Sequence, residues 1–437
     1  MNVPAALNLW LAIPWEVRLA TLFVLGVMAG ALANVAIYRL AWHCRPIDPW
    51  FAPAPEAPPR RWWDRIPIVG WWGLRREATL HGTGFWLRPM AVELLFGVAL
   101  AGLYTWEVGR MGLVHPLAPA WVGQANLHWL HAQFLAHAVV LWLVVTTSLI
   151  DIDEKTIPDA LTVPGTLAGL ILAATIPFAL LPVPWRAWGP QGAQQIDFGF
   201  LTVVSPHVWR GWVQDLGRPS LLGVGLACWW LWCVALLHRT WYSRHGWCRA
   251  AALMLARLAR SPSTPRILLM GAVGTLAIVA VWRQGGWHWV GLLSSLVGMA
   301  GGAAVVWIVR VLGTLALRRE AMGFGDVTLM AALGTFLGWQ GALIVFFLAP
   351  LAGIAIGVPT VLISRDSEIP YGPYLCLAAA AVIVFWARLW MVLEPHFLVL
   401  GVWIPVVVGV CLALLPVILV FLRLGRKVVA GVLAARQ

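Results

Sequence analysis

The sequence predicts an all-α fold, a polytopic bundle of about 9–11 transmembrane helices with a cytoplasmic loop between the first two spans. Hydrophobic residues make up 61% of the 437 positions and charged residues only 11%. That is more apolar surface than a soluble core of this length can bury. The apolar residues are also grouped into long runs, and the basic residues fall between them. These three observations together predict a membrane protein.

Each predicted span is an apolar run close to the roughly 20 residues that cross a bilayer. The first run is preceded by little positive charge and is followed by no obvious small-residue cleavage site, so we expect a retained helix and not a removed signal peptide. The candidate runs are 17–41, 90–109, 132–150, 160–182, 220–238, 267–283, 289–310, 326–339, 341–363, 374–392 and 399–422.

The distribution of arginines predicts how the chain is oriented in the membrane. The arginines are densest between Trp42 and Arg88, and basic residues are retained on the cytoplasmic side of a membrane. The predicted N-terminus is therefore outside and the C-terminus inside. The predicted parts are a first span with a short outside N-terminus (1–41), a cytoplasmic loop (42–89), and the remaining bundle (90–437) with inserted loops at 183–219 and 239–266. The basic second insert is either an amphipathic interfacial helix or a solvated loop.

Four carboxylates interrupt the apolar sequence between the third and fourth predicted spans, in SLIDIDEKTIPDALTVPG. An ionisable residue at membrane depth is costly, and it is by default a functional hypothesis. Asp151 stands at the cytoplasmic end of the third span and is the strongest candidate. Asp159, after Pro158, fits an N-terminal helix cap. Asp153 and Glu154 fit a hydrated turn.

A second motif, AMGFGDVTLMAALGTFLGWQ, places an aspartate at the start of another apolar helix. Gly323 and Gly325 precede Asp326, and glycine permits close approach of another chain segment. Two carboxyl groups in a poorly solvated site cannot both ionise cheaply, so Asp151 and Asp326 could share a proton. One would activate water while the other polarises a carbonyl, as in aspartic proteases. The roles cannot be divided between them, because the titration belongs to the pair.

The sequence gives less support to two other classes of function. A proton-coupled transporter could use the same aspartates as a relay, but it would be expected to have inverted repeats and broken helices near the middle of the membrane. Both aspartates instead stand at span ends on one side. Nucleic-acid binding is not expected, because the arginines lie between spans and form no basic face on a folded domain.

Five separated segments resemble the type IV prepilin leader peptidases, which are polytopic GxGD aspartyl proteases of bacterial inner membranes. Besides the two motifs above, they are NVAIYRL (34–40), RIPIVGWWGLR (65–75) leading to RPMAVELLFG (88–97), and IPYGPYLCLA (369–378). The resemblance implies that Asp151 and Asp326 are the catalytic pair, facing the cytoplasm, and that Asp159 is a recurrent noncatalytic residue. It implies as substrate a prepilin or pseudopilin precursor, cut after the glycine that ends a short basic leader. No cofactor is implied for proteolysis.

The predicted cytoplasmic loop departs from that family's pattern. Many members also methylate the new N-terminus with S-adenosylmethionine, and their loop bears two Cys pairs that resemble a zinc site. Here the loop has only Cys44, and with His43 and His81 it offers three ligands at most, whereas a structural zinc site needs four. We therefore expect no metal, and we expect S-adenosylmethionine to bind only if methyl transfer is retained.

Overall fold

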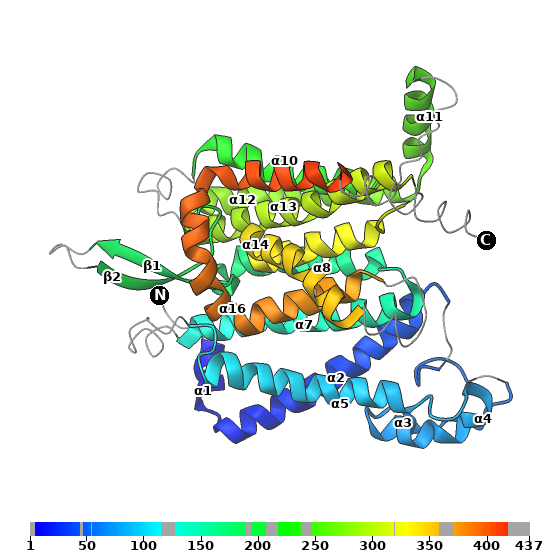
Figure 1. The fold of residues 1–437 in the computed structure, drawn as a ribbon. Helices are drawn as coiled ribbons and strands as arrows, with labels where there is room; N and C mark the ends of the chain where they lie inside the picture. The colour runs from blue at the N-terminus through cyan, green and yellow to red at the C-terminus, as the bar shows by residue number, and fades with distance from the viewer. Residues whose placement is uncertain are drawn as a thin grey trace, which may run out of the picture.

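The computed structural model describes residues 5–43, 47–53, 55–114, 127–188, 194–206, 217–237, 247–318, 320–357 and 370–417, which are mostly helical (Figure 1). The elements are α1 (Ala5–Ala12), α2 (Trp15–Leu40), η1 (Trp62–Arg65), α3 (Val69–Leu74), η2 (Arg75–Glu77), α4 (Ala78–His81), α5 (Leu87–Tyr104), η3 (Thr105–Gly109), α7 (Leu127–Glu154), α8 (Asp159–Thr175), η4 (Pro177–Ala179), β1 (Pro182–Trp188), β2 (Gln194–Phe200), α10 (Pro219–Ala235), α11 (Trp247–Arg260), α12 (Ser263–Gln284), α13 (Gly286–Leu317), α14 (Phe324–Ala352), η6 (Gly353–Gly357), α16 (Gly372–Leu400) and η7 (Gly401–Trp403).

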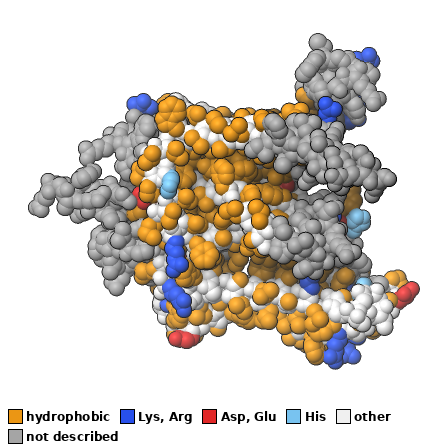
Figure 2. Space-filling view, in the orientation of Figure 1, with side chains coloured by type: hydrophobic (Ala, Val, Ile, Leu, Met, Phe, Trp, Pro, Cys, Tyr) orange, Lys and Arg blue, Asp and Glu red, His pale blue; other side chains and the backbone are white. Residues whose placement is uncertain are grey.

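The chain is a multi-pass membrane protein, as predicted. Within the described ranges, 7 helical segments are long and apolar enough to cross a bilayer. Shorter apolar helices, Asp159–Thr175, Pro219–Ala235 and Ile404–Val417, complete the bundle. Hydrophobic side chains cover much of the face seen in Figure 2, as expected for a surface in contact with lipid tails. The long segments are Trp15–Leu40, Leu87–Gly109, His128–Glu154, Ser263–Gln284, Gly286–Leu317, Phe324–Gly357 and Gly372–Leu400.

Helix α14 is broken at Gly338 and turns back on itself (Figure 1). Gly338 has φ of 67° and ψ of 174°, a conformation that glycine adopts without a steric penalty. A Cβ atom at Gly302 on α13 would lie 2.6 Å from the Met330 carbonyl oxygen, before the break, and 3.3 Å from Ala342 Cβ, after it. Both legs therefore pack on α13. The break falls where the sequence separates the predicted spans 326–339 and 341–363.

Small residues allow α13 and α14 to pack closely. The glycines at 298 and 334 face each other, so that a Cβ atom on either would overlap the backbone of the other helix. Ser295 Oγ on α13 also donates a hydrogen bond of 2.7 Å to the Thr335 carbonyl oxygen. Close helix contact through small residues, with side-chain to backbone hydrogen bonds, is a common way to join helices in a bilayer.

The region predicted as the inserted loop 183–219 contains most of a β-hairpin, which was not predicted. Strands β1 and β2 pair antiparallel, with Pro182 opposite Phe200. The bundle holds the hairpin at its base, since Trp386 Nε1 donates a 2.6 Å hydrogen bond to the Pro182 carbonyl oxygen. Gln340 Nε2 donates to the carbonyl oxygens of Thr202 and Ser205 just beyond β2. In the second insert, 239–266, α11 is helical, and residues 238–246 lie outside the described residues.

The α13–α14 contact predicts a difference between two glycine-to-alanine variants. Gly334→Ala should lower the free energy of unfolding by about 1–3 kcal/mol, because the added methyl group overpacks the interface. Gly223→Ala, on α10, should leave it unchanged or slightly higher, because a Cβ atom there meets nothing within 4 Å. Thermal unfolding of the purified chain in detergent measures both, and equal midpoints for the two variants would contradict the close contact.

Candidate active site

Asp151 and Asp326 come together at one end of the bundle. Asp151 is in the last turn of α7 and Asp326 in the first turn of α14. Their exposed fractions are only 4% and 7%, and their carboxylates lie close enough to interact electrostatically. Two buried carboxylates beside each other cannot both carry a negative charge cheaply. The arrangement therefore suits a pair of groups that share a proton.

Helix α16 supplies a third wall of the site at its N-terminal end. The backbone N–H of Gly372 donates a hydrogen bond to Asp151. A Cβ atom at Gly372 would lie 2.5 Å from Asp151 Oδ2 and 2.8 Å from Ile157 Cδ1, so only glycine fits between them. This segment, IPYGPYLCLA, is part of the family resemblance, which implies no role for any of its residues.

Tyr371, just before α16, faces the same site. Burial first, and then the negative charge of Asp326, raise the pKa of its phenol above the ordinary range. Tyr371 is therefore a neutral O–H group at physiological pH and a potential hydrogen-bond donor. Sequence reasoning missed this residue, because nothing in the local pattern distinguishes it from an interfacial tyrosine.

The two glycines of the GFGD motif have different structural roles. Gly323 donates a backbone hydrogen bond to Asp326 and has room for a side chain, since a Cβ atom would come no closer than 3.7 Å to Asp326 Oδ2. Gly325 packs directly on the connection between α7 and α8, where a Cβ atom would lie 2.8 Å from Ile157 Cβ and 3.0 Å from its carbonyl oxygen. Gly325 thus brings the start of α14 against the segment that follows Asp151.

Asp159 lies beside this contact and outside the aspartate pair. The prediction that it caps α8 is wrong by one position, because Pro158 is the N-cap and Asp159 is the first helical residue. A carboxylate in the first turn is still favoured by the helix dipole. Asp159 Oδ1 accepts a hydrogen bond of 3.4 Å from Thr328 Oγ1 on α14, and Thr162 Oγ1 donates to the same hydroxyl at 3.0 Å. These contacts join α8 to α14.

The hydrated turn predicted at Asp153 and Glu154 is wrong. Both residues belong to the last turn of α7, and both pair with residues from the other side of the site. Arg88 Nη1 lies 2.8 Å and 2.9 Å from the two Asp153 carboxylate oxygens, and His43 Nδ1 lies 2.9 Å from Glu154 Oε2. The side chain of Glu154 is 7% exposed. These contacts fix the end of α7, and with it Asp151, to the start of α5 and to the loop that follows α2.

Glu93 on α5 anchors the first loop, residues 42–89, to the bundle. Its Oε1 accepts hydrogen bonds from Trp71 Nε1 at 2.7 Å and from Asn34 Nδ2 on α2 at 3.1 Å, and its Oε2 accepts one from the Ile68 backbone N–H at 2.5 Å. Ile68 has a φ of 63°, an unusual conformation for a β-branched residue. The N-terminal segments that carry the family resemblance therefore meet at one carboxylate.

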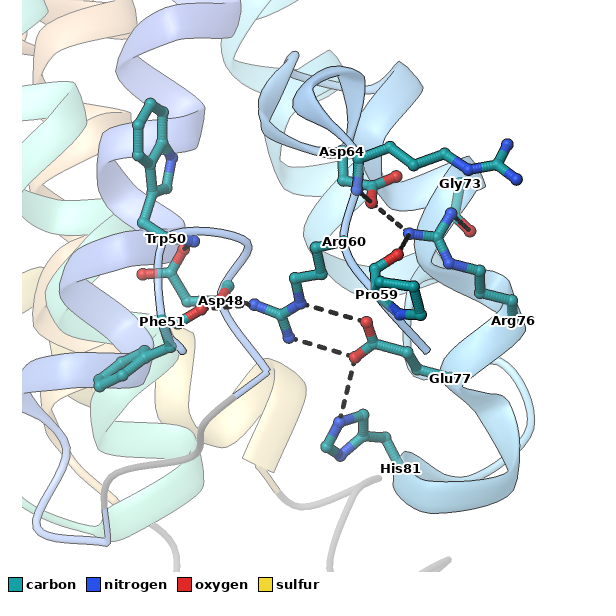
Figure 3. A network of polar contacts seen from close by, with 11 residues as sticks. Asp48, Trp50, Phe51, Pro59, Arg60, Asp64, Gly73, Arg76, Glu77 and His81 are labelled. Atoms are coloured by element: carbon teal, nitrogen blue, oxygen red, sulfur yellow. Dashed lines mark hydrogen bonds and ion pairs between the residues drawn. The ribbon is translucent and has the colours of Figure 1, made fainter. Parts of the chain in front are cut away.

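Ion pairs hold the rest of this loop together (Figure 3). The guanidinium of Arg60 binds both carboxylate oxygens of Glu77 at 3.1 Å and donates to the carbonyl oxygens of Asp48 and Phe51 at 2.8 Å and 2.9 Å. His81 Nε2 lies 3.5 Å from Glu77 Oε2. Nearby, Arg76 pairs with a buried aspartate, Asp64. Among the described residues, no group of three or more His, Cys, Asp or Glu could hold a metal ion; Cys44 lies outside them.

The fold and the site define a polytopic membrane protein with two buried aspartates at one end of its helical bundle. Residues 264–358, which contain Asp326 but not Asp151, match the model of the type IV leader peptidase family. This match confirms the resemblance predicted from the sequence. No solved structure matches.

Curated relatives are named as leader peptidases too. A prepilin leader peptidase/N-methyltransferase of Aeromonas hydrophila is 38% identical over 92 residues, 20% of this chain and 32% of the relative. Proteins with that name from Burkholderia pseudomallei (strain 1026b) and Myxococcus xanthus (strain DK1622) are 28% identical over 159 residues and 31% identical over 157 residues. These two matches cover 36% and 35% of this chain, and 48% and 39% of the relatives. The chain thus spans less than half the length of these relatives.

The contacts of the GFGD glycines predict that alanine substitutions at the two positions have unequal effects on thermal stability. Gly325→Ala should lower the thermal midpoint of the purified chain, because its methyl group meets the backbone of Ile157, at a cost of about 1–3 kcal/mol. Gly323→Ala should change the midpoint little, because the position is open. If Gly323→Ala were instead the more damaging variant, the packing described for the start of α14 would be incorrect.

Proposed function

We propose that this chain is a membrane aspartic endopeptidase that removes the basic leader peptide from type IV prepilin-like or pseudopilin precursors. The observation that carries the proposal is the meeting of Asp151 and Asp326, from distant parts of the chain, in a buried site at one end of the bundle. The family match and the names of the curated relatives support the substrate class.

In the proposed reaction, the two carboxyl groups hold one proton between them. The ionised carboxylate takes a proton from water, and the water oxygen attacks the scissile carbonyl carbon. The protonated partner donates its proton to the carbonyl oxygen. The tetrahedral intermediate then collapses, the C–N bond breaks, and a proton passes from the pair to the leaving amine. Gly372 and Gly323 hold the two carboxylates by backbone N–H groups, and Tyr371 offers a neutral O–H group beside Asp326.

We propose that the site lies at the cytoplasmic face of a bacterial inner membrane. The support is the high arginine density of residues 42–89, because such loops remain cytoplasmic. His43 and Arg88 of this range contact the end of α7 that carries Asp151. Water from that side is the second substrate of the hydrolysis. The proposed proteolysis uses no cofactor, since two carboxyl groups supply both the acid and the base.

Methyl transfer lies outside the proposed core function. The relatives' names include it, but the loop 42–89 departs from the cysteine pattern of the family, and its described part is held by Arg60, Arg76 and their carboxylate partners. S-adenosylmethionine would be a cofactor only if this second activity is retained. The mass of the mature substrate N-terminus reports it directly, as one added methyl group.

The proton-coupled transporter is the less supported function. Gly338 does break α14, and broken helices occur in transporters. The break, however, lies three helical turns beyond Asp326 along α14, and the two aspartates lie at helix ends. The carboxylates are therefore placed for contact with one side of the membrane.

Substitution of either aspartate should abolish cleavage. We expect Asp151→Asn and Asp326→Asn to lose leader removal by a factor of about 10³ or more, because an amide can neither take nor donate the catalytic proton. The measurement is co-expression with a prepilin precursor, scored by the size of the mature product. Asp159→Asn is the matched control, since that carboxylate is exposed and lies outside the pair. Normal processing by either of the first two variants would disprove the assignment.

A further inference from the structure

The described arginines of the first loop, residues 42–89, which runs into the start of α5, fall into two groups. The first group has carboxylate partners among the described residues: Arg60 with Glu77, Arg76 with Asp64, and Arg88 with Asp153. The second group is exposed and has no ion pair with a described carboxylate: Arg61, Arg65 and Arg75. The first group holds the loop together. The second group contributes positive charge that no described carboxylate neutralises through an ion pair.

Each arginine of the second group stacks on a tryptophan. The guanidinium carbon lies 5.1 Å from the ring centroid of Trp63 for Arg61, 5.3 Å from that of Trp50 for Arg65, and 4.6 Å from that of Trp72 for Arg75. These are cation–π distances. Stacking occupies the face of a guanidinium and leaves its N–H edge available to two oxygens of a phosphate or carboxylate group.

Two of these three tryptophans are open to solvent, and the third, Trp63, is half-buried. Trp50 is 54% exposed and Trp72 is 53% exposed, and Val69, close to Trp72 in the chain, is 55% exposed. A cluster of exposed large apolar groups marks an interaction site more often than a solvated surface. We call the six stacked residues the Arg–Trp surface: Trp50, Arg61, Trp63, Arg65, Trp72 and Arg75. Figure 2 shows basic and hydrophobic side chains side by side over the α3 region.

The Arg–Trp surface is held next to the membrane. Its residues lie between two spans, α2 and α5, and Glu93 on α5 binds the backbone of Ile68 and the ring of Trp71 within the same segment. The loop therefore stays close to the ends of α2 and α5 (Figure 1). Tryptophan and arginine are the residues that favour the headgroup layer at this level of a bilayer.

We propose that the Arg–Trp surface binds the phosphate headgroups of anionic phospholipids. The three arginines offer charge complementarity to an anionic membrane surface, and guanidinium groups bind phosphate through two parallel N–H donors. The indole rings beside them fit the zone between headgroups and acyl chains. The basic leader of the proposed substrate carries the same charge as the surface, so it would be repelled there. The lipid assignment does not depend on the proposed peptidase activity.

Hydrogen exchange of the full chain in lipid nanodiscs tests the proposal. Nanodiscs of phosphatidylcholine alone are compared with nanodiscs that also contain phosphatidylglycerol. We expect the anionic lipid to slow amide exchange severalfold in peptides covering residues 60–76, and high salt to reverse the effect. Peptides from β1 and β2 should show no such change.

Variants separate lipid binding from a change in folding. Arg61→Gln with Arg75→Gln should abolish the dependence on phosphatidylglycerol, whereas Arg61→Lys with Arg75→Lys should keep part of it, because the charge remains. The matched control is Arg110→Gln with Arg283→Gln, which removes the same charge from two exposed arginines outside the loop and should retain the full effect. An unchanged thermal midpoint of the first pair excludes misfolding.

Three results would overturn the proposal. The first is exchange that does not depend on the anionic lipid. The second is a dependence that survives Arg61→Gln with Arg75→Gln. The third is protection that appears in pure phosphatidylcholine when a precursor protein is added, which would make the Arg–Trp surface a protein-binding site.

Discussion

The close placement of two carboxylates away from bulk water is the constraint on which the rest of this end of the molecule depends. A buried carboxylate is costly unless hydrogen bonds and neighbouring groups compensate for lost solvation. Here the compensation comes from backbone N–H groups, of Gly372 for Asp151 and of Gly323 for Asp326. Both donors lie where a new helix begins, so the site exists only when α7, α14 and α16 meet.

Glycines make that meeting possible. A side chain at Gly325 would push α14 away from Ile157, and one at Gly372 would push α16 away from Asp151. On the other side of α7, Arg88 and His43 hold the carboxylates of Asp153 and Glu154. The loop between α2 and α5 therefore supports the site from outside, although no described residue of it enters the aspartate pair. Within the loop, Arg60 binds Glu77 and the carbonyl oxygens of Asp48 and Phe51, and these contacts hold the loop segments together.

Much of this was predictable from the sequence because its signals are local. Apolar runs indicate the spans, and the break of α14 at Gly338 lies at the end of the predicted span 326–339, just before the next one begins. Asp151 and Asp326 were predicted from charge at span ends, and the structure brings them together, while their catalytic role stays a prediction. Contacts between segments that are distant in the chain leave no local pattern in the sequence. The partners of Asp153 and Glu154, and the parts played by Tyr371 and Gly372, depend on segments that are distant in the chain. The β-hairpin was missed because Pro182 and Pro184 in β1 argue against a strand, although Ile196, Phe198 and Phe200 alternate along β2.

The central claim, that Asp151 and Asp326 face each other, can be tested by cross-linking without reference to activity. In a chain whose six native cysteines are replaced, Asp151→Cys with Asp326→Cys is treated with a short bifunctional thiol reagent, and mass spectrometry locates the linked peptides. The structure predicts an intramolecular link between the helix ends of α7 and α14, and none for Asp153→Cys with Asp326→Cys, because Asp153 points toward Arg88. A link in the second pair and not in the first would contradict the site.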